Sequence, residues 1–278
     1  MGRVHSKKMV VRRAPAPIRG GLIIGLATSL WAPASSYAWT LSADFEAGTV
    51  GARANGTSGF GYATTQTFFS ETRAHGGVRS ARVGFLQGAE EGTGGSVGYP
   101  NLSEGDEIWA RGYFYFASPF SWACSPVVKI LRIRVNTASD SHVAWHSVFA
   151  NSQGQILLSN EVQSHQPTTN VRFDVDQWQS IEIYVKFSAT AGIIRIWKNG
   201  QLVIEDKSRR TLAASSNVSN QSNVFTYWNG GHPQTQYGWI DDFVWTSERP
   251  SSVDAHGNPM IGPTSTRRDL TVPFNLRY

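Results

Sequence analysis

Four strand-length runs between Trp178 and Thr246 decide the fold of this chain. They are WQSIEIYVKF (residues 178–187), IIRIWKNGQLVIEDK (193–207), NVFTYWNGG (223–231) and QYGWIDDFVWT (236–246). Each run is rich in Val, Ile, Tyr, Phe and Trp, and Gly, Asn and Ser clusters separate them, which is typical of β-strands joined by turns. Because Asn199-Gly200 is the dipeptide of a tight type I′ turn, the residues on either side of it are predicted to pair as a hairpin.

Alternation of side chains predicts which strand faces are buried. Successive residues of a strand point to opposite faces, so a spacing of two places residues on one side. Two runs show this period clearly. The apolar sets, predicted to face the core, are Ile181, Ile183, Val185 and Phe187 in one run and Ile108, Ala110, Phe114 and Phe116 in the other. The opposite sets are Glu182, Tyr184 and Lys186, and Trp109, Arg111, Tyr113 and Tyr115.

The rest of the chain continues the strand pattern. Further strands are predicted at residues 39–46, 67–70, 80–85, 107–117, 127–135, 142–150 and 155–162. The glycine-rich stretch from Gln87 to Gly98 is predicted to be a surface loop. Since no helical period of useful length interrupts this series, the expected fold is an all-β, antiparallel two-sheet β-sandwich of the jelly-roll type.

Residues 1–38 have the pattern of an export signal. A basic segment without acidic residues precedes the apolar stretch Leu22–Ala32, and Ser36-Tyr37-Ala38 offers a small-residue cleavage site. The apolar stretch is short for a bilayer span, so no stable membrane insertion is expected after removal of the leader. The predicted organisation is a leader at 1–38, one sandwich domain at 39–250, and a C-terminal tail at 251–278 packed on it. Secretion or delivery to a periplasm follows, by a general or a twin-arginine route.

Charge and cysteine content exclude several classes of function. The formal net charge of +5 comes from 25 basic and 20 acidic residues, and six of the basic residues lie in the leader. The mature chain is therefore nearly neutral, which argues against a nucleic-acid-binding protein. Cys124 is the only cysteine, so an intrachain disulfide and a thiolate metal cluster are both excluded. The chain is expected to be a monomer.

Several sequence segments resemble those of one superfamily. They are DFE at the end of the first strand, G-x-x-S-A-R-V, I-W-A-R-x-Y-F-Y-F, W-x-x-I-E-I-Y-V-K, I-x-I-W-x-N-G and the closing W-I-D-D-F-V. Together they resemble the concanavalin A-like lectin/glucanase jelly rolls, and in particular bacterial secreted polysaccharide lyases and laminin-G-like domains. The resemblance covers residues 39–248. It implies that one sheet is concave and cradles a glycan, but the fold hosts hydrolases, lyases and pure binders alike.

Polar and aromatic residues on the predicted strands suggest a groove for an acidic polysaccharide. Aromatic rings can stack on sugars, and guanidinium groups grip carboxylates through two hydrogen bonds. The candidate substrate-binding residues are Trp109, Tyr113, Arg134, His142 and Tyr184. The alternative is an ordinary solvated sheet face with snorkelling Arg and Lys stems.

The chemistry that best suits these residue types is β-elimination from a uronate. Hydrolysis needs a pair of carboxylates, and the E-x-D-x-x-E signature of the jelly-roll glucanases is absent. Elimination instead needs a cation that neutralises the C5 carboxylate and a group that takes the C5 proton. The candidate catalytic residues are Arg111, His146, Tyr115, Arg132 and Lys186, and Lys129 is a further cation that could neutralise the carboxylate. The alginate-lyase signatures R-x-E-L-R, Q-I-H and Y-F-K-A-G-x-Y are absent, so two non-catalytic alternatives stay open, a carbohydrate-binding module and a laminin-G-like adhesion domain.

The resemblance also implies a structural calcium ion, and no organic cofactor is expected. In this fold the last strand often gives a carboxylate to a calcium ion beside the first strand, and calcium prefers oxygen ligands. The candidate ligands are Glu46, Asp241 and Asp242, with backbone near Gly77. The alternative is that these aspartates are simply paired or bonded to backbone N–H groups.

Overall fold

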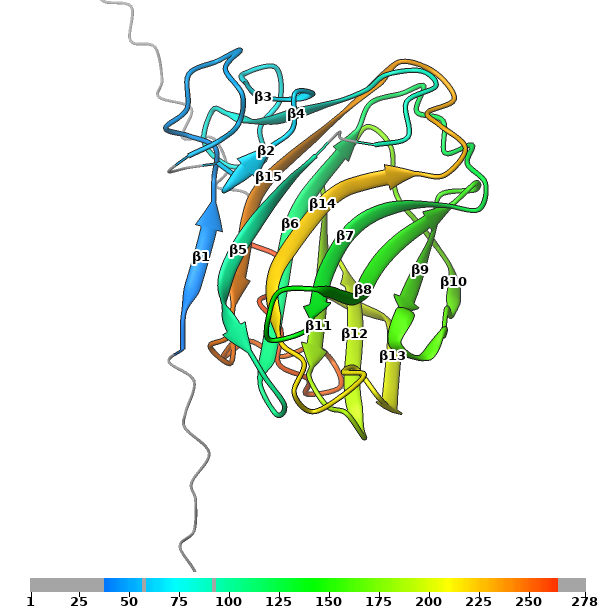
Figure 1. Cartoon of the computed structure of the whole chain (residues 1–278). Helices are drawn as coiled ribbons and strands as arrows, with labels where there is room; N and C mark the ends of the chain where they lie inside the picture. The colour runs from blue at the N-terminus through cyan, green and yellow to red at the C-terminus, as the bar shows by residue number, and fades with distance from the viewer. Residues whose placement is uncertain (1–37, 57–58, 92–93, 265–278) are drawn as a thin grey trace, which may run out of the picture. The chain divides into compact units, whose positions relative to one another are not determined.

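The computed structural model describes residues 38–56, 59–91 and 94–264 and places them in two stacked antiparallel sheets (Figure 1). The predicted leader therefore lies outside the described residues, except for Ala38. Within these ranges no α-helix occurs, and one 3-10 turn, η1 (Glu161–Gln163), follows a strand. No helix of the described chain is long and apolar enough to cross a bilayer.

The first sheet has eight strands. They are β1 (Thr40–Ala43), β3 (Thr67–Ser70), β4 (Ser80–Phe85), β6 (Glu107–Phe116), β11 (Gln179–Lys186), β12 (Gly192–Lys198), β13 (Gln201–Arg209) and β15 (Gln236–Thr246). Their order is β13-β12-β11-β6-β15-β4-β3, and β1 pairs with β15.

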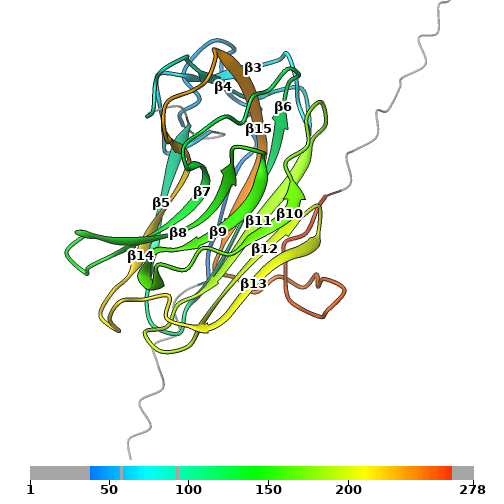
Figure 2. The ribbon, with the colours of Figure 1, turned by 90° about the vertical axis from the view of Figure 1, so that its right-hand side faces the viewer.

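The second sheet has seven strands in the order β10-β9-β8-β7-β14-β5-β2. They are β2 (Tyr62–Ala63), β5 (Gly95–Leu102), β7 (Val127–Asn136), β8 (His142–Asn151), β9 (Gln155–Asn160), β10 (Thr168–Arg172) and β14 (Ser219–Trp228). Figure 2 shows the two sheets as separate layers, with β7, β8 and β14 in one and β11, β12 and β13 in the other.

The predicted core face is confirmed. The predicted inward-facing residues of β6 and of the run from Ile181 to Phe187 are all fully buried. The hairpin is confirmed as well, because β12 and β13 are joined by Asn199 and Gly200 with φ of 50° and 77°, as a type I′ turn requires. In the middle of β6, Gly112 is needed for packing, since a Cβ there would lie 2.2 Å from the ring of Phe243.

One loop prediction is wrong. The stretch from Gln87 to Gly98 is not all loop, because β5 begins at Gly95 and pairs with β14. At Gly95 a Cβ would lie 2.3 Å from the ring of Phe60. In the sequence this glycine suggests a turn, but in the structure it allows close packing within the sheet.

The segment 251–264 lies against the outer side of the eight-stranded sheet, away from the other sheet (Figure 2, orange-red). The side chain of Trp109 donates from Nε1 to the carbonyl of Pro259 at 2.9 Å. Trp197 on β12 donates from Nε1 to Asp254 at 2.9 Å. We call residues 251–264 the strap.

Candidate functional site

The polar side chains proposed to line one groove lie on two different sheets. Arg111 lies on β6 of the eight-stranded sheet, whereas Arg132 and Arg134 lie on β7 of the seven-stranded sheet. The expectation that they meet in a single groove is therefore wrong. The alternation of residues shows which side of a strand is polar, but it does not show to which sheet the strand belongs.

Most of the candidates on the eight-stranded sheet are buried beneath the strap. Trp109, Arg111, Tyr113 and Tyr184 are each at most 4 % exposed. Arg111 donates to the carbonyls of Gly262 at 2.9 Å and Asp242 at 3.0 Å. The hydroxyl of Tyr113 accepts from the backbone N–H of Thr264 at 2.7 Å. Trp109, Arg111 and Tyr113 thus bind the backbone of the strap, which covers this part of the sheet.

The two remaining candidates on this sheet lie apart from each other. Tyr115 packs under the guanidinium of Arg73, whose Cζ is 4.3 Å from its ring centroid. Lys186 is at the far end of β11, where it pairs in register with Glu107. The same Glu107 accepts a 2.6 Å hydrogen bond from Tyr184, and burial raises the pKa of that hydroxyl above its usual value.

His146 is a core residue. It points between the sheets with no exposed area, and its Nε2 forms a 2.7 Å hydrogen bond with the carbonyl of Thr211. Burial lowers the pKa of His146 to about 4, so the ring is neutral at neutral pH. No substrate can reach it there, so the expectation that His146 is a catalytic residue is wrong. His146 lies on the inward side of β8, and Trp145 lies on the outward side.

The outer face of the seven-stranded sheet holds the remaining candidates around Arg132. This arginine is 6 % exposed, and its Cζ lies 4.0 Å from the ring centroid of Trp145. Its three nitrogens donate to Ser147 at 3.2 Å, Thr226 at 3.3 Å and Glu161 at 3.0 Å. Burial lowers the pKa of Arg132 to about 10, and Glu161 counteracts this shift. Strands β7, β8 and β14 thus fix a cation rigidly on this face.

A lysine and a tyrosine lie beside each other on the same face. Lys129 on β7 pairs in register with Tyr227 on β14, and its Nζ is 4.7 Å from the ring centroid. Burial, followed by the charge of Arg132, lowers the pKa of Lys129. The hydroxyl of Tyr227 donates to Glu90, and this hydrogen bond raises the tyrosine pKa. A lysine with a lowered pKa and a tyrosine with a raised pKa are thus adjacent.

Arg134 and His142 mark the other end of this face. Arg134 donates to Gln221 at 3.0 Å and forms an exposed pair with Asp140 at 3.5 Å. The ring of His142 is tilted against that of Trp145 with centroids 5.4 Å apart, and burial lowers the pKa of His142.

A small pocket adjoins Arg132. Its volume is about 140 Å³, and Tyr62, Thr64, Asn223 and Thr226 are among its lining residues. Asn223 pairs in register with Arg132, and its Oδ1 is buried without a partner among the described residues. Tyr62 is 58 % exposed. An exposed ring and an unpaired amide oxygen thus flank the arginine.

The comparisons with known proteins concern the fold. No protein-family model matches the chain, and no curated protein matches it either. Among solved structures, it is similar to the alginate lyase vAL-1 from Chlorella virus, with a TM-score of 0.52 and 13 % identity over 66 % of this chain and 90 % of that one. An endo-β-1,4-glucuronan lyase from the fungus Trichoderma reesei gives 0.54 and 11 % over 80 % and 99 %. The alginate lyase Aly36B gives 0.54 and 18 % over 74 % and 96 %.

The chain has the concanavalin A-like jelly-roll fold. The structural similarity concerns the arrangement of the two sheets. At identities this low, the residues of the site have to be judged on their own geometry.

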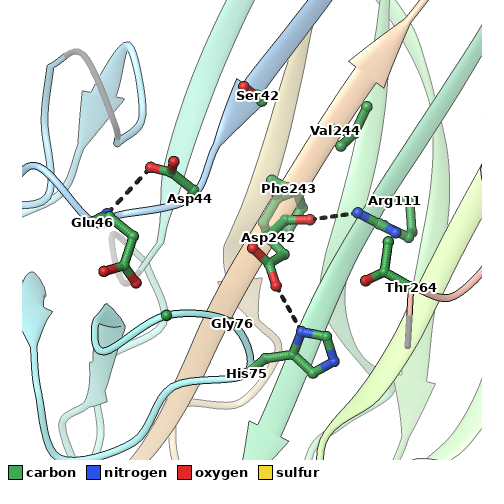
Figure 3. A pocket seen from close by; sticks show the side chains of 11 residues that line it. Ser42, Asp44, Glu46, His75, Gly76, Arg111, Asp242, Phe243, Val244 and Thr264 are labelled. Atoms are coloured by element: carbon green, nitrogen blue, oxygen red, sulfur yellow. Dashed lines mark hydrogen bonds and ion pairs between the residues drawn. The ribbon is translucent and has the colours of Figure 1, made fainter. Parts of the chain in front are cut away.

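A further pocket lies on the eight-stranded sheet, opposite the one that carries Arg132. It has a volume of about 460 Å³, and Asp44, Glu46, His75, Arg111 and Asp242 are among its lining residues (Figure 3). Asp242 accepts a 2.7 Å hydrogen bond or ion pair from His75. We place the candidate site on the other sheet, because the arginine of this pocket is committed to backbone carbonyls.

The three predicted calcium ligands have other partners. Asp241 accepts from the backbone N–H groups of His75 at 2.7 Å and Gly76 at 3.2 Å. Glu46 accepts from Val78 at 3.0 Å and Arg79 at 2.9 Å. Among the residues that the structure describes, no group of three or more His, Cys, Asp or Glu side chains could hold a metal ion. The hydrogen bonds to backbone N–H groups account for the positions of these carboxylates without a cation, and calcium stays a prediction.

Chelation tests that prediction. Burial and then the neighbouring Asp242 raise the pKa of Asp241 to about 8, so a nearby cation would stabilise its ionised form. If calcium binds Asp241 or Asp242, removing it should lower the melting temperature, and adding it back should restore the value by mass action. Melting curves that coincide for demonstrably metal-free and calcium-saturated protein would eliminate the site.

Several residues of the candidate site are not predicted from the sequence. The sequence pattern does not select Trp145, Ser147, Thr226 or Tyr227. A signal existed in NVFTYWNGG, where Asn223 and Tyr227 carry polar groups within an otherwise apolar strand. Register shifts in β14 between Val224 and Tyr227 and in β7 between Lys129 and Leu131 hid their common orientation.

Proposed function

We propose that this chain is an exported polysaccharide lyase that cleaves an acidic, uronate-containing polysaccharide by β-elimination. The site is the outer face of the seven-stranded sheet. The observation that carries the proposal is Arg132, a buried guanidinium fixed beside the Lys129–Tyr227 pair. The structurally similar proteins described as alginate and glucuronan lyases support the same class of substrate. Export rests on the leader predicted at residues 1–38.

Arg132 is proposed to neutralise the uronate carboxylate. A guanidinium carries five N–H donors, and Ser147, Thr226 and Glu161 engage one donor on each nitrogen. Each terminal nitrogen therefore retains one N–H for a substrate carboxylate. Pairing with this charge makes the C5 proton more acidic, since negative charge developing at C5 spreads into the carboxylate.

Lys129 and Tyr227 are proposed as base and acid. The neutral amine of Lys129 takes the proton from C5, and the electron pair of that C–H bond forms the C4=C5 double bond. The C4–O bond breaks, and the departing oxygen takes the proton of the Tyr227 hydroxyl. Lys129 ends protonated and Tyr227 ends as a tyrosinate, so one proton passes back through solvent before the next cycle. The opposite pKa shifts of the two groups suit these roles.

Aromatic side chains on both sides of Arg132 would hold neighbouring sugars. Trp145 lies against the guanidinium on the β8 side, and Tyr62 lines the small pocket on the β14 side. Arg134 and His142 extend the face beyond Trp145 and would contact a further uronate. The substrate chain would then run across β8, β7 and β14.

A non-catalytic glycan-binding module is the second candidate function. The hydrogen bond from Tyr227 to Glu90 favours it, because in this arrangement the proposed acid points its proton at a protein carboxylate. In that case the face would bind an acidic polysaccharide and leave its bonds intact.

A substrate screen tests the proposal and separates it from this alternative. The exported protein is incubated with alginate, polyglucuronate and polygalacturonate, and with dextran as a neutral control. Elimination creates a C4=C5 double bond that absorbs in the ultraviolet, so a lyase should raise the absorbance with at least one acidic polysaccharide. Binding to an acidic polysaccharide without any rise would support the binding module, and neither response would refute both.

A further inference from the structure

A second cationic and aromatic surface lies on the opposite sheet, beyond the strap. Two arginines stack there on aromatic rings of the outer face. The Cζ of Arg82 on β4 is 5.0 Å from the ring centroid of Tyr237 on β15. The Cζ of Arg73 lies 4.3 Å from the ring of Tyr115 and 5.0 Å from that of Trp239. We call these five side chains the outer aromatic surface.

The two guanidinium groups have no anionic partner in the described part of the chain. Neither Arg73 nor Arg82 forms an ion pair or a side-chain hydrogen bond with a described residue, whereas the nearby Arg79 pairs with Glu71 at 3.1 Å. Stacking satisfies the faces of these groups and leaves their N–H edges free. A guanidinium with free edges can take a carboxylate through two parallel hydrogen bonds.

The rings of this surface are held in place by the sheet. Tyr237 pairs in register with Gly84, and a Cβ at Gly84 would lie 3.7 Å from the Tyr237 ring, so the ring lies over the glycine. Trp239 is two residues further along β15 on the same side, and its Nε1 donates to Thr72 at 2.9 Å. Tyr237 is still 42 % exposed, and it is therefore a fixed ring that is open to solvent.

Hollows flank the surface on both sides. One, of about 380 Å³, is lined by Tyr237, Trp239, Pro119 and Gln234 among others. Another, also of about 380 Å³, is lined by Arg82 with Phe68 and Glu71 among others. A chain-like ligand that crosses Tyr237 would have room on either side of the ring.

We propose that the outer aromatic surface is a second, non-catalytic site for an acidic polysaccharide. A sugar ring would stack on Tyr237, and uronate carboxylates would pair with Arg82 and Arg73. Glu71 repels anions at one edge, which would favour a chain that runs from Arg82 toward Arg73 and Trp239. The choice of an acidic polysaccharide rests on the proposed function, whereas the site itself rests on this geometry. Binding on both sheets would hold long chains more tightly than short ones.

The test is binding of alginate and of dextran to surface variants. Arg73→Ala/Arg82→Ala and Tyr237→Ala are each made in an Arg132→Ala background, so that turnover does not consume the probe. Loss of the two charged contacts should weaken alginate affinity at least about tenfold. The remaining affinity should depend less on salt than the parent's. Arg172→Ala is the matched control, since it removes one exposed charge from the edge strand β10 and should leave affinity unchanged.

The outcomes separate this site from the catalytic proposal. Unchanged alginate affinity in both variants would overturn the second site, as would equal binding of dextran and alginate. If the parent protein has no lyase activity but binds alginate through Arg73 and Arg82, the proposed function is refuted and the second binding site is supported. With Arg132 intact, turnover of short oligosaccharides should be the same in Arg73→Ala/Arg82→Ala as in the parent, and a matching loss there would also overturn the proposal.

Discussion

Replacing Lys129 by Ala is expected to lower kcat/KM on the acidic polysaccharide by about 10²- to 10⁴-fold, the usual contribution of a positioned base. The reason is that the variant lacks the amine proposed to take the C5 proton, whose pKa burial lowers. The fold should persist, because Lys129 is half-buried at the sheet surface and its main interaction is with the ring of Tyr227. Initial rates of the ultraviolet absorbance change, together with the melting temperature, measure both effects.

Lys129→Arg separates a base from a simple charge. The guanidinium keeps the positive charge but stays protonated, so the activity should remain nearly as low as in Lys129→Ala. Lys207→Ala is the matched control, since this exposed lysine on β13 pairs with Glu205 and should be dispensable. Full activity in Lys129→Arg would contradict the role of base and leave Lys129 as a binding residue.

The pH profile gives an independent check on the same pair. A base must be neutral, so kcat/KM should rise with pH through the pKa of Lys129, which lies below the usual value of lysine. An acid must be protonated, so the rate should fall again through the pKa of Tyr227, which lies above the usual value of tyrosine. The optimum is therefore expected on the alkaline side of neutrality, and an acidic optimum would argue against both assignments.

The strands could be predicted from local sequence, but their sheets could not. Alternation in β6 identified its buried face because packing repeats every two residues, and Asn199-Gly200 fixed one hairpin because only a few residues adopt positive φ. Nothing local distinguishes β6 from β7, since both combine an apolar side with arginines. Sheet membership depends on pairing between distant strands, such as β6 with β15 and β7 with β14. The arginines were therefore assigned to one groove although they lie on opposite sheets.

The strap explains why the polar side of β6 looked like a binding site. Trp109, Arg111 and Tyr113 do bind a polymer, but it is the chain's own residues 259–264. The side-chain chemistry that recognises an extended backbone overlaps with the chemistry that recognises a glycan, because both polymers present regularly spaced donors and acceptors. The backbone offers N–H and C=O groups, and the glycan offers hydroxyl groups. Sequence could identify the recognising groups and could not identify what they recognise.

Replacing Glu182 by Ala is expected to cost about 2–6 kcal/mol of stability, because it leaves two buried backbone donors unpaired and each costs about 1–3 kcal/mol. Glu182 is 2 % exposed, and its carboxylate accepts from the N–H groups of Ile261 at 2.7 Å and Gly262 at 2.9 Å. It also pairs in register with Arg111, which is equally buried. The variant would leave these two backbone donors without their acceptor. Denaturant unfolding measures the loss, and Lys198→Ala, which breaks a more exposed pair with Asp174 on the same sheet, is the comparison.

The same residue predicts how strap docking responds to pH. Burial raises the pKa of Glu182 to about 7 from 4.5, so the folded state binds this proton more tightly than the unfolded chain. The contribution to stability is therefore complete below about pH 4.5 and decreases as the pH rises to about 7. Glu182→Gln carries no titrating proton and should lack this slope, while cleavage of the strap by a protease should become faster with rising pH only in the parent. Parallel pH profiles of the parent and Glu182→Gln would show that another group controls the strap.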